Sequence, residues 1–312
     1  MKDKLNIKKL LKLAGHLVVI LALAFVVKKI IEMDIKLGDL SSPSVIGAFV
    51  LSLVIQAAQI IIACFPWLMF TRSLSGRKIP YSAAMPVYTQ SNIYKYLPGN
   101  VFQYVGRNKL AADMDISHVD VACATILDVF FCVFWTGMVS VILLGSKIAE
   151  LLDKYGRNLF IAGAAGILLL IASFAVVWLK FRGRLQSYLS RYSKAFEKSN
   201  RLQLLSGIFY YFAHNIVSAA MYFCCMALIV PQAGTKELLT LTGAFMFAWI
   251  IGFVTPGAPG GIGIREGVMM FVCGNSYADR ILLFVLIMRI ASVFADVSAF
   301  LIGRIYAKAK NH

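Results

Sequence analysis

Two stretches rich in proline and glycine, residues 96–107 (YLPGNVFQYVGR) and residues 255–266 (TPGAPGGIGIRE), decide how this chain folds. In each, a Pro-Gly pair is followed by seven residues and then by an arginine, Arg107 or Arg265. The two copies keep a single offset of 158 positions (265 − 107 = 158). Because Pro removes a backbone donor and Gly adopts conformations that other residues resist, each motif predicts a break in a helix.

The rest of the chain is built of long apolar segments. Of its 312 residues, 60% are hydrophobic and 15% are charged, and the mean hydropathy is +0.77. Soluble domains are about half apolar and about a quarter charged. Several runs reach the ~18 residues needed to cross the hydrocarbon layer. We therefore predict a single all-α polytopic membrane domain over 1–312, with full spans at 13–31, 44–70, 118–145, 159–179, 204–230 and 279–303 and interrupted stretches at 82–110 and 238–275.

The flanking spans follow nearly the same offset, which indicates an inverted repeat. The span that begins at 44 matches the one at 204, and the span at 118 matches the one at 279. Each half, 13–145 and 159–303, then contains three spans and one re-entrant hairpin. Three crossings are an odd number, so the second half lies upside down, which is typical of secondary transporters. The alternative, in which both Pro-Gly pairs are ordinary loops between full spans, stays open.

The basic residues lie mostly in links on one side of this layout. With a cytoplasmic N-terminus, the cytoplasmic links hold 21 of the 31 basic residues, Lys95 and Arg107 among them, and the opposite links hold seven. The positive-inside rule then places both termini in the cytoplasm and the protein in the cytoplasmic membrane. The net charge of +16 needs no nucleic-acid partner, because the cations do not form one stripe with interleaved aromatic residues.

The first apolar run resembles a secretory signal peptide, with basic residues up to Lys12 and Ala22-Leu23-Ala24 as a candidate cleavage site. It continues past two lysines to Ile31, which favours an uncleaved first span. The six cysteines lie inside apolar segments with no second pair or His at metal-ligand spacing, and no nucleotide-binding or hydrolase motif is present. We therefore expect neither a metal nor a cofactor.

Charged residues at membrane depth are costly and mark candidate sites. A guanidinium can hold a phosphate through two parallel bonds, so Arg107 and Arg265 are candidate contacts for an anionic head group. Internal ion pairs of Arg289 or Arg265 with carboxylates are the alternative. The candidate substrate-binding residues are Gln103, Tyr104, Arg107, Asp128, Arg265, Glu266, Arg289 and Asp296. The predicted helix breaks are Pro98, Gly99, Pro256, Gly257, Pro259, Gly260, Gly261 and Gly263.

With these motifs the chain resembles the flippase-like family that forms the transmembrane region of lysylphosphatidylglycerol synthases. The resemblance covers essentially the whole chain. In the bifunctional synthases, a soluble aminoacyl-transferase domain follows the membrane region, which is associated with moving the modified lipid between leaflets. These 312 residues contain no such domain, so a lysyltransferase label is unsafe. The resemblance implies a lipid-handling role, while other stand-alone members look associated with envelope glycan or polyprenyl-lipid pathways.

The sequence therefore predicts a flippase-like translocator or binder of an anionic phospholipid or polyprenyl-phosphate-linked lipid. Its expected partners are membrane lipids with anionic head groups and enzymes of envelope biosynthesis. Two alternatives stay open. One is a membrane enzyme or enzyme subunit that transfers an aminoacyl or glycosyl group to a lipid, and the other is a scaffold that positions a synthase.

Overall fold

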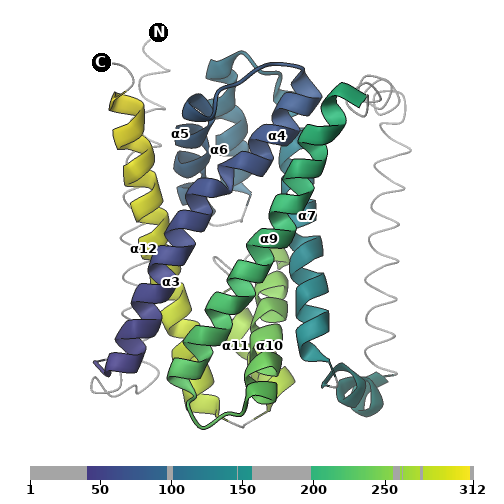
Figure 1. Cartoon of the computed structure of the whole chain (residues 1–312), viewed down its shortest axis with the longest axis vertical. Coiled ribbons are helices and arrows are strands. Elements are labelled where there is room, and N and C mark those ends of the chain that lie inside the picture. Colours follow the sequence, from purple (N-terminus) through teal and green to yellow (C-terminus); the bar gives the residue numbers. More distant parts are fainter. Residues whose placement is uncertain are drawn as a thin grey trace.

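The computed structural model describes residues 41–96, 101–145, 147–156, 198–255, 261, 263–274 and 277–309. Within these ranges the regular structure is entirely helical, with no strand (Figure 1). The predicted spans 13–31 and 159–179 lie outside the described residues. Six of the predicted helix breaks do as well: Pro98, Gly99, Pro256, Gly257, Pro259 and Gly260.

The described elements are long helices joined by short ones. Residues 147–156 are also helical. In chain order the remaining elements are α3 (Pro43–Ile62), α4 (Cys64–Ser75), α5 (Tyr81–Asn92), the short 3-10 helix η1 (Ile93–Tyr96), α6 (Phe102–Ala111), η2 (Ala112–Met114), α7 (His118–Leu144), α9 (Lys198–Ile229), α10 (Thr235–Val254), α11 (Ile264–Cys273) and α12 (Ala278–Ala309).

Five helical segments in the described part are long and apolar enough to cross a membrane: Pro43–Ser75, His118–Leu144, Arg201–Ile229, Thr235–Val254 and Ala278–Ala309. Even the 27 residues of α7 extend about 40 Å at 1.5 Å per residue, more than the ~30 Å hydrocarbon layer. The four predicted spans that fall on described residues are therefore confirmed as apolar helices of membrane-spanning length. The chain is an all-α membrane protein.

The outer surface of the bundle carries large apolar side chains that a soluble protein would bury. Ile126 on α7 and Phe209 on α9 each expose 67% of their area, and Val54 on α3 exposes 61%. Extended exposed apolar surface marks contact with a membrane or a partner. These helix faces suit contact with lipid chains.

Local sequence explains where the helices begin and end. Ser117 caps α7 by accepting a hydrogen bond from the Asp120 backbone N–H at 3.1 Å. Pro66 has no N–H to donate, and the predicted span 44–70 is accordingly divided at Ala63 into α3 and α4. Glu237 accepts a hydrogen bond from the Gly234 N–H at 3.0 Å and so closes the start of α10.

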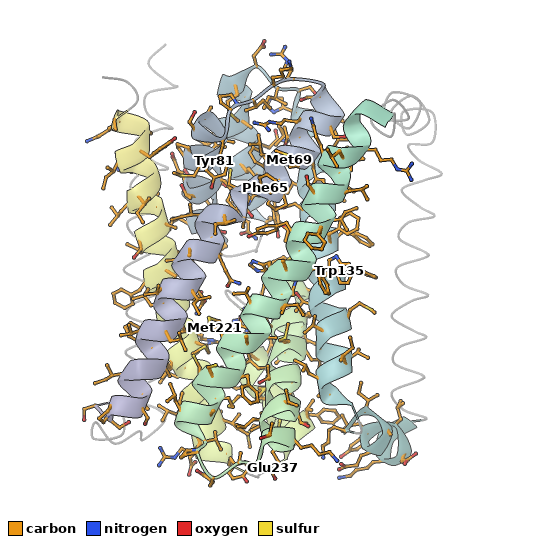
Figure 2. The ribbon with its side chains drawn as sticks, in the orientation of Figure 1. Phe65, Met69, Tyr81, Trp135, Met221 and Glu237 are labelled. Carbon is orange, nitrogen blue, oxygen red and sulfur yellow. The ribbon has the colours of Figure 1, made fainter. Side chains whose placement is uncertain are left out.

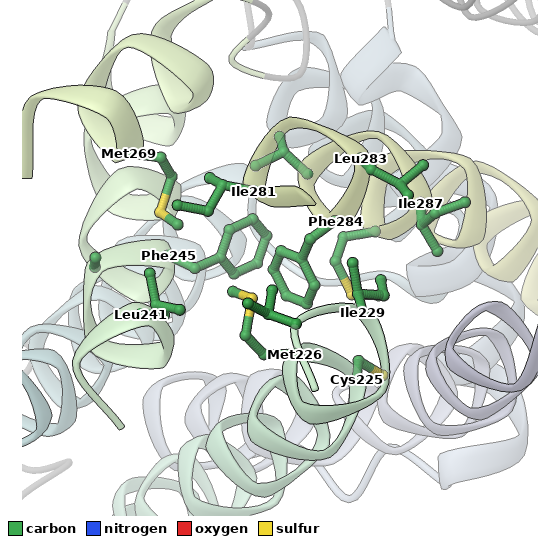
Figure 3. Close-up of a cluster of buried hydrophobic side chains, with 14 of the residues drawn as sticks. Cys225, Met226, Ile229, Leu241, Phe245, Met269, Ile281, Leu283, Phe284 and Ile287 are labelled. Carbon is green, nitrogen blue, oxygen red and sulfur yellow. The ribbon is translucent and has the colours of Figure 1, made fainter. Parts of the chain in front are cut away.

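Two clusters of buried apolar side chains hold the two ends of the bundle. In the first, Phe245 of α10 meets Phe284 of α12 edge to face, with ring centroids 4.9 Å apart (Figure 3). The second surrounds Trp67 and includes Met69. Figure 2 shows Met69 near the upper end and Met221, a member of the first cluster, in the lower half. Polar groups lie between the two clusters.

Each interrupted stretch folds back to the end at which it started. Arg77, before α5, pairs with Asp115, after α6, at 2.7 Å. Glu237, in the first turn of α10, accepts a hydrogen bond from the Tyr277 hydroxyl, after α11, at 3.2 Å. In Figure 1 the α5–α6 hairpin occupies the upper half of the bundle and the α10–α11 hairpin the lower half. The two hairpins therefore enter from opposite ends.

The returning helix of each hairpin is short. Helices α6 and α11 have 10 residues each, which corresponds to about 15 Å of helix. That is half of the ~30 Å hydrocarbon layer, so neither helix can cross it alone. Helix α10, the other arm of the second hairpin, has 20 residues and is by itself of membrane-spanning length.

Candidate functional site

One helix, α12, holds the tips of both hairpins through two buried charges. Arg289 Nη2 donates to the Gly261 carbonyl at 2.8 Å and to Glu266 Oε2 at 3.2 Å, both in the second hairpin. Asp296, seven residues further on, accepts bonds from the tip of the first hairpin. Seven residues correspond to about 10 Å along a helix. Helix α12 thus fixes the spacing of the two tips.

Three side chains of the first hairpin converge on Asp296. Asn92 Nδ2 donates to Oδ1 at 2.7 Å, Lys95 Nζ lies 2.8 Å from Oδ1 and 2.7 Å from Oδ2, and the Tyr96 hydroxyl donates to Oδ2. The Asp296 side chain is fully buried, whereas that of Lys95 is 29% exposed. The carboxylate is therefore satisfied by neutral donors as well as by a cation.

The ion pair of Arg289 with Glu266 is one of the internal pairs that the sequence left open. Arg289 and Asp296 lie on one face of α12, yet each pairs with a different hairpin because their own spacing along the helix is too large for direct contact. Lys95, assigned to a cytoplasmic link, lies at the buried tip of η1, and Arg107 is also buried. Without these two, 19 basic residues (21 − 2 = 19) remain on the predicted cytoplasmic side against seven.

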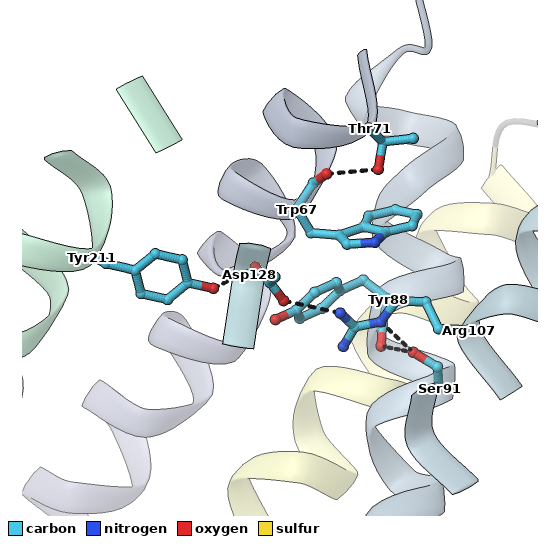
Figure 4. Close-up of polar contacts among 7 residues, drawn as sticks. All are labelled: Trp67, Thr71, Tyr88, Ser91, Arg107, Asp128 and Tyr211. Atoms are coloured by element: carbon cyan, nitrogen blue, oxygen red, sulfur yellow. Dashed lines mark hydrogen bonds and ion pairs between the residues drawn. The ribbon is translucent and has the colours of Figure 1, made fainter. Parts of the chain in front are cut away.

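Arg107 pairs with Asp128 inside the bundle (Figure 4). Its Nη1 donates to Asp128 Oδ2 at 3.0 Å, and the two residues are only 2% and 4% exposed. The guanidinium carbon lies 3.9 Å from the centroid of the Tyr88 ring, a cation–π contact. The Tyr211 hydroxyl donates to the other carboxylate oxygen. The proposed role of Arg107 as a head-group contact stays a prediction, while in this structure its charge is matched internally.

Arg265 is left without a carboxylate. Four cations lie in the inner part of the described bundle: Lys95, Arg107, Arg265 and Arg289. Asp296 pairs with Lys95, Asp128 pairs with Arg107, and Glu266 pairs with Arg289. Arg265 Nε is buried with no hydrogen-bond partner among the described residues. Residues 256–260 of the sequence include no acidic residue. Arg265, a partly buried residue whose Nε is fully buried, thus has no carboxylate partner among the described residues.

Glycine brings the two arms of the second hairpin together at Arg265. A Cβ on Gly252 of α10 would lie 3.0 Å from Arg265 Cγ and 3.1 Å from the Cα of Gly261. Gly261 and Gly263 have positive φ angles of 70° and 79°, which other residues resist. Their positive φ angles let the chain turn beside Arg265, and Gly263 directly precedes the start of α11.

A cavity of about 200 Å³, lined by both polar and apolar side chains, lies between the hairpins. Asn92 and Lys95 from the first hairpin and Trp249 from the second contribute to its wall, and Ser292 of α12 lies between the two anchoring charges. Gln56 of α3 also lines it, and its Nε2 is buried without a hydrogen-bond partner in the described part of the chain. No carboxylate is among the described residues that line the cavity.

The remaining candidates lie near the Arg107 pair. Gln103 is 7% exposed and lies on α6 with Tyr104, which is partly buried. Sequence reasoning missed Lys95, Asn92 and Tyr96 as partners of Asp296. The signal that could have found them is their position just before the first Pro-Gly pair, at the tip of a predicted hairpin. The described residues contain no group of His, Cys, Asp and Glu that could hold a metal ion.

Comparison of the chain with protein-family models, curated proteins and solved structures finds no match. The resemblance to the flippase-like family therefore stays an expectation from the two motifs. The function has to be argued from the site itself.

Proposed function

We propose that this protein binds a membrane lipid with an anionic phosphate head group and moves it between the leaflets of the cytoplasmic membrane. The observation that carries the proposal is Arg265 at the tip of the second hairpin, a cation with no carboxylate partner among the described residues. An unmatched charge in a low-dielectric interior costs several kcal/mol, and intramembrane charges normally have partners. A bound anion would supply the missing partner.

The arrangement of the hairpins supports transport rather than static binding. Two hairpins that start from opposite ends and meet at mid-depth are the pattern of inverted-repeat transporters, whose substrate sites lie where the interrupted helices meet. In our proposal the repeats are 13–145 and 159–303. The first hairpin enters from the cytoplasm and both termini are cytoplasmic, in agreement with the distribution of Lys and Arg.

Arg265 is not among the residues that line the cavity, and in our proposal the head group occupies the cavity as well, so the size of the cavity constrains the ligand. At about 30 Å³ per water molecule, 200 Å³ is the volume of about seven waters, below the ~300 Å³ at which pockets for drug-sized ligands begin. A phosphate with a small polar substituent fits this volume, and acyl or prenyl chains do not. The chains would stay in the bilayer against the exposed apolar helix faces while the head group crosses inside the protein.

Reconstituted vesicles test the proposal. Fluorescent phosphatidylglycerol is placed in both leaflets, and dithionite then bleaches the outer leaflet only. We expect the purified protein to expose the inner pool to bleaching, and Arg265→Gln to slow this exposure at least about tenfold, the factor that corresponds to about 1.4 kcal/mol. Arg280→Gln is the matched control, because Arg280 lies exposed at the start of α12.

Two results would contradict the proposal. The first is equal movement of phosphatidylglycerol and zwitterionic phosphatidylcholine, which would show that the head-group charge is not recognised. The second is an unchanged rate for Arg265→Gln in protein that remains monodisperse. In cells that depend on the protein, the same variant should alter the leaflet distribution of the lipid.

A further inference from the structure

The tip of the first hairpin is attached to α12 by three hydrogen-bond donors, of which only one is charged. Asp296 is fully buried and is bonded by Asn92 and Tyr96, two neutral donors, in addition to Lys95. If Lys95 left, the carboxylate would still accept two hydrogen bonds. A buried carboxylate that keeps such bonds is far less costly than one left bare.

Lys95 is also the charged donor among the three, and it lines the cavity together with Asn92. Its side chain is 29% exposed and contributes to the cavity wall, whereas Asp296 has no exposed side-chain area. A lysine ammonium is a compact charge on a flexible four-carbon stem, so it can change partners by rotating its side chain. A ligand in the cavity could therefore reach Lys95, although it could not reach the Asp296 side chain.

A second donor in the same wall lacks a partner. Gln56 Nε2 is buried and makes no hydrogen bond with any described residue, although buried amides normally do. By contrast, Gln59 in the same wall donates to the Ser218 hydroxyl at 2.9 Å and to the His214 carbonyl at 3.2 Å. Gln56 thus offers a donor that internal contacts leave unused, and a phosphate oxygen could accept from it.

We propose that Lys95 is the residue that recognises the anion in the cavity, and that it does so by exchanging the Asp296 carboxylate for a phosphate oxygen of the ligand. Gln56 donates to a second oxygen. This inference rests on the proposed function and refines it. The ligand carries a phosphate-type anion, and because no carboxylate lines the described cavity wall, a cationic aminoacylated head group is disfavoured. Binding also removes one of the three side chains that tie the tip of the first hairpin to α12.

The exchange predicts that substitutions of Asp296 and Lys95 change the affinity for the anion in opposite directions. A purely structural ion pair does not predict this. Asp296→Asn removes the competitor of the ligand, so Lys95 is freed and the anion should bind more tightly. Lys95→Gln removes the recognising charge, so the anion should bind more weakly, and Lys95→Arg should restore most of the binding. If the pair only maintained the fold, both neutral substitutions would weaken binding together.

Isothermal titration of the purified full chain with dihexanoyl-phosphatidylglycerol measures these effects. We expect at least a tenfold change in Kd in each direction, about 1.4 kcal/mol. Lys147→Gln is the control, because it removes a lysine from the Lys147–Glu150 pair, whose glutamate is 64% exposed. The double variant Lys95→Gln/Asp296→Asn keeps neutral hydrogen-bonding groups at both positions and should bind as weakly as Lys95→Gln alone. Weaker binding by Asp296→Asn, or unchanged binding by Lys95→Gln, would overturn the inference.

Further titrations distinguish a lipid head group from a free phosphate. They also show whether the exchange alone or the proposed function is wrong. Glycerol phosphate and inorganic phosphate are titrated beside the lipid. Opposite signs for the two variants with the soluble anions as well would support the exchange and identify a free phosphate ester as the ligand. If Arg265→Gln abolishes lipid movement while Lys95→Gln binds normally, the exchange alone fails. If no anionic lipid binds to the native chain, the proposed function fails with it.

Discussion

The buried pair of Arg107 and Asp128 leads to a quantitative prediction about stability. Asp128→Ala removes the acceptor of both Arg107 Nη1 and the Tyr211 hydroxyl at a position only 4% exposed. Breaking a buried ion pair by removing one partner costs about 3–5 kcal/mol, because the other charge is left uncompensated. The contact of the guanidinium with the Tyr88 ring persists in the variant and so does not reduce this difference.

The chain offers a matched control for this experiment. Arg77 and Asp115 form the same kind of pair at 2.7 Å, but with side chains 51% and 89% exposed. Such a pair contributes about 0–1 kcal/mol, so Asp115→Ala should change the free energy of unfolding little. We would measure unfolding by titrating dodecyl sulfate into detergent-solubilised protein. The double variant Arg107→Met/Asp128→Leu removes both charges and should recover most of the loss.

Two outcomes would refute the reasoning. Equal losses for Asp128→Ala and Asp115→Ala would mean that burial does not determine the energy of the pair. A double variant as unstable as Asp128→Ala would mean that lost packing, and not an uncompensated charge, destabilises the single variant.

Two further predictions concern the second hairpin and the orientation of the chain. Gly252→Ala places a Cβ 3.1 Å from Gly261 Cα and should cost about 1–3 kcal/mol in thermal or dodecyl sulfate unfolding, whereas Gly47→Ala, whose nearest neighbour is 3.8 Å away, should not. No difference between them would contradict the close packing. In a cysteine-free background, Lys236→Cys should react with an impermeant maleimide in intact cells and Lys308→Cys only after lysis. The reverse pattern would invert the proposed orientation.

Much of the fold could be predicted because membrane spans depend on local composition. Spans and helix breaks follow from runs of apolar residues and from Pro and Gly, all of which are visible within about 20 residues of sequence. Gly261 and Gly263, which have positive φ angles, were predictable for the same reason. The boundaries of α7 and α12 lie within a few residues of the predicted spans or extend them by one to two turns.

The partners of the buried charges could not be predicted in this way. Asp296 pairs with Lys95, 201 positions away, and nothing in the spacing of either residue indicates this contact. Arg107 was expected to contact a head group, which stays a prediction, and a single sequence did not show that Asp128 would pair with it. Pairing depends on which helices pack together, and periodicity alone does not encode that.

The contact between Gly252 and Gly261 has a consequence for how the two halves would move. In the second hairpin, the backbone of Gly252 lies close to the backbone of Gly261, with the Arg265 side chain packed beside the contact. The first is joined to α12 by side chains, one of which can change its partner. Although the two motifs are alike in sequence, the second hairpin would then act as the fixed reference and the first as the moving part. Distances from spin labels on α5 to α10 should therefore change during transport, while those from α10 to α11 should stay constant.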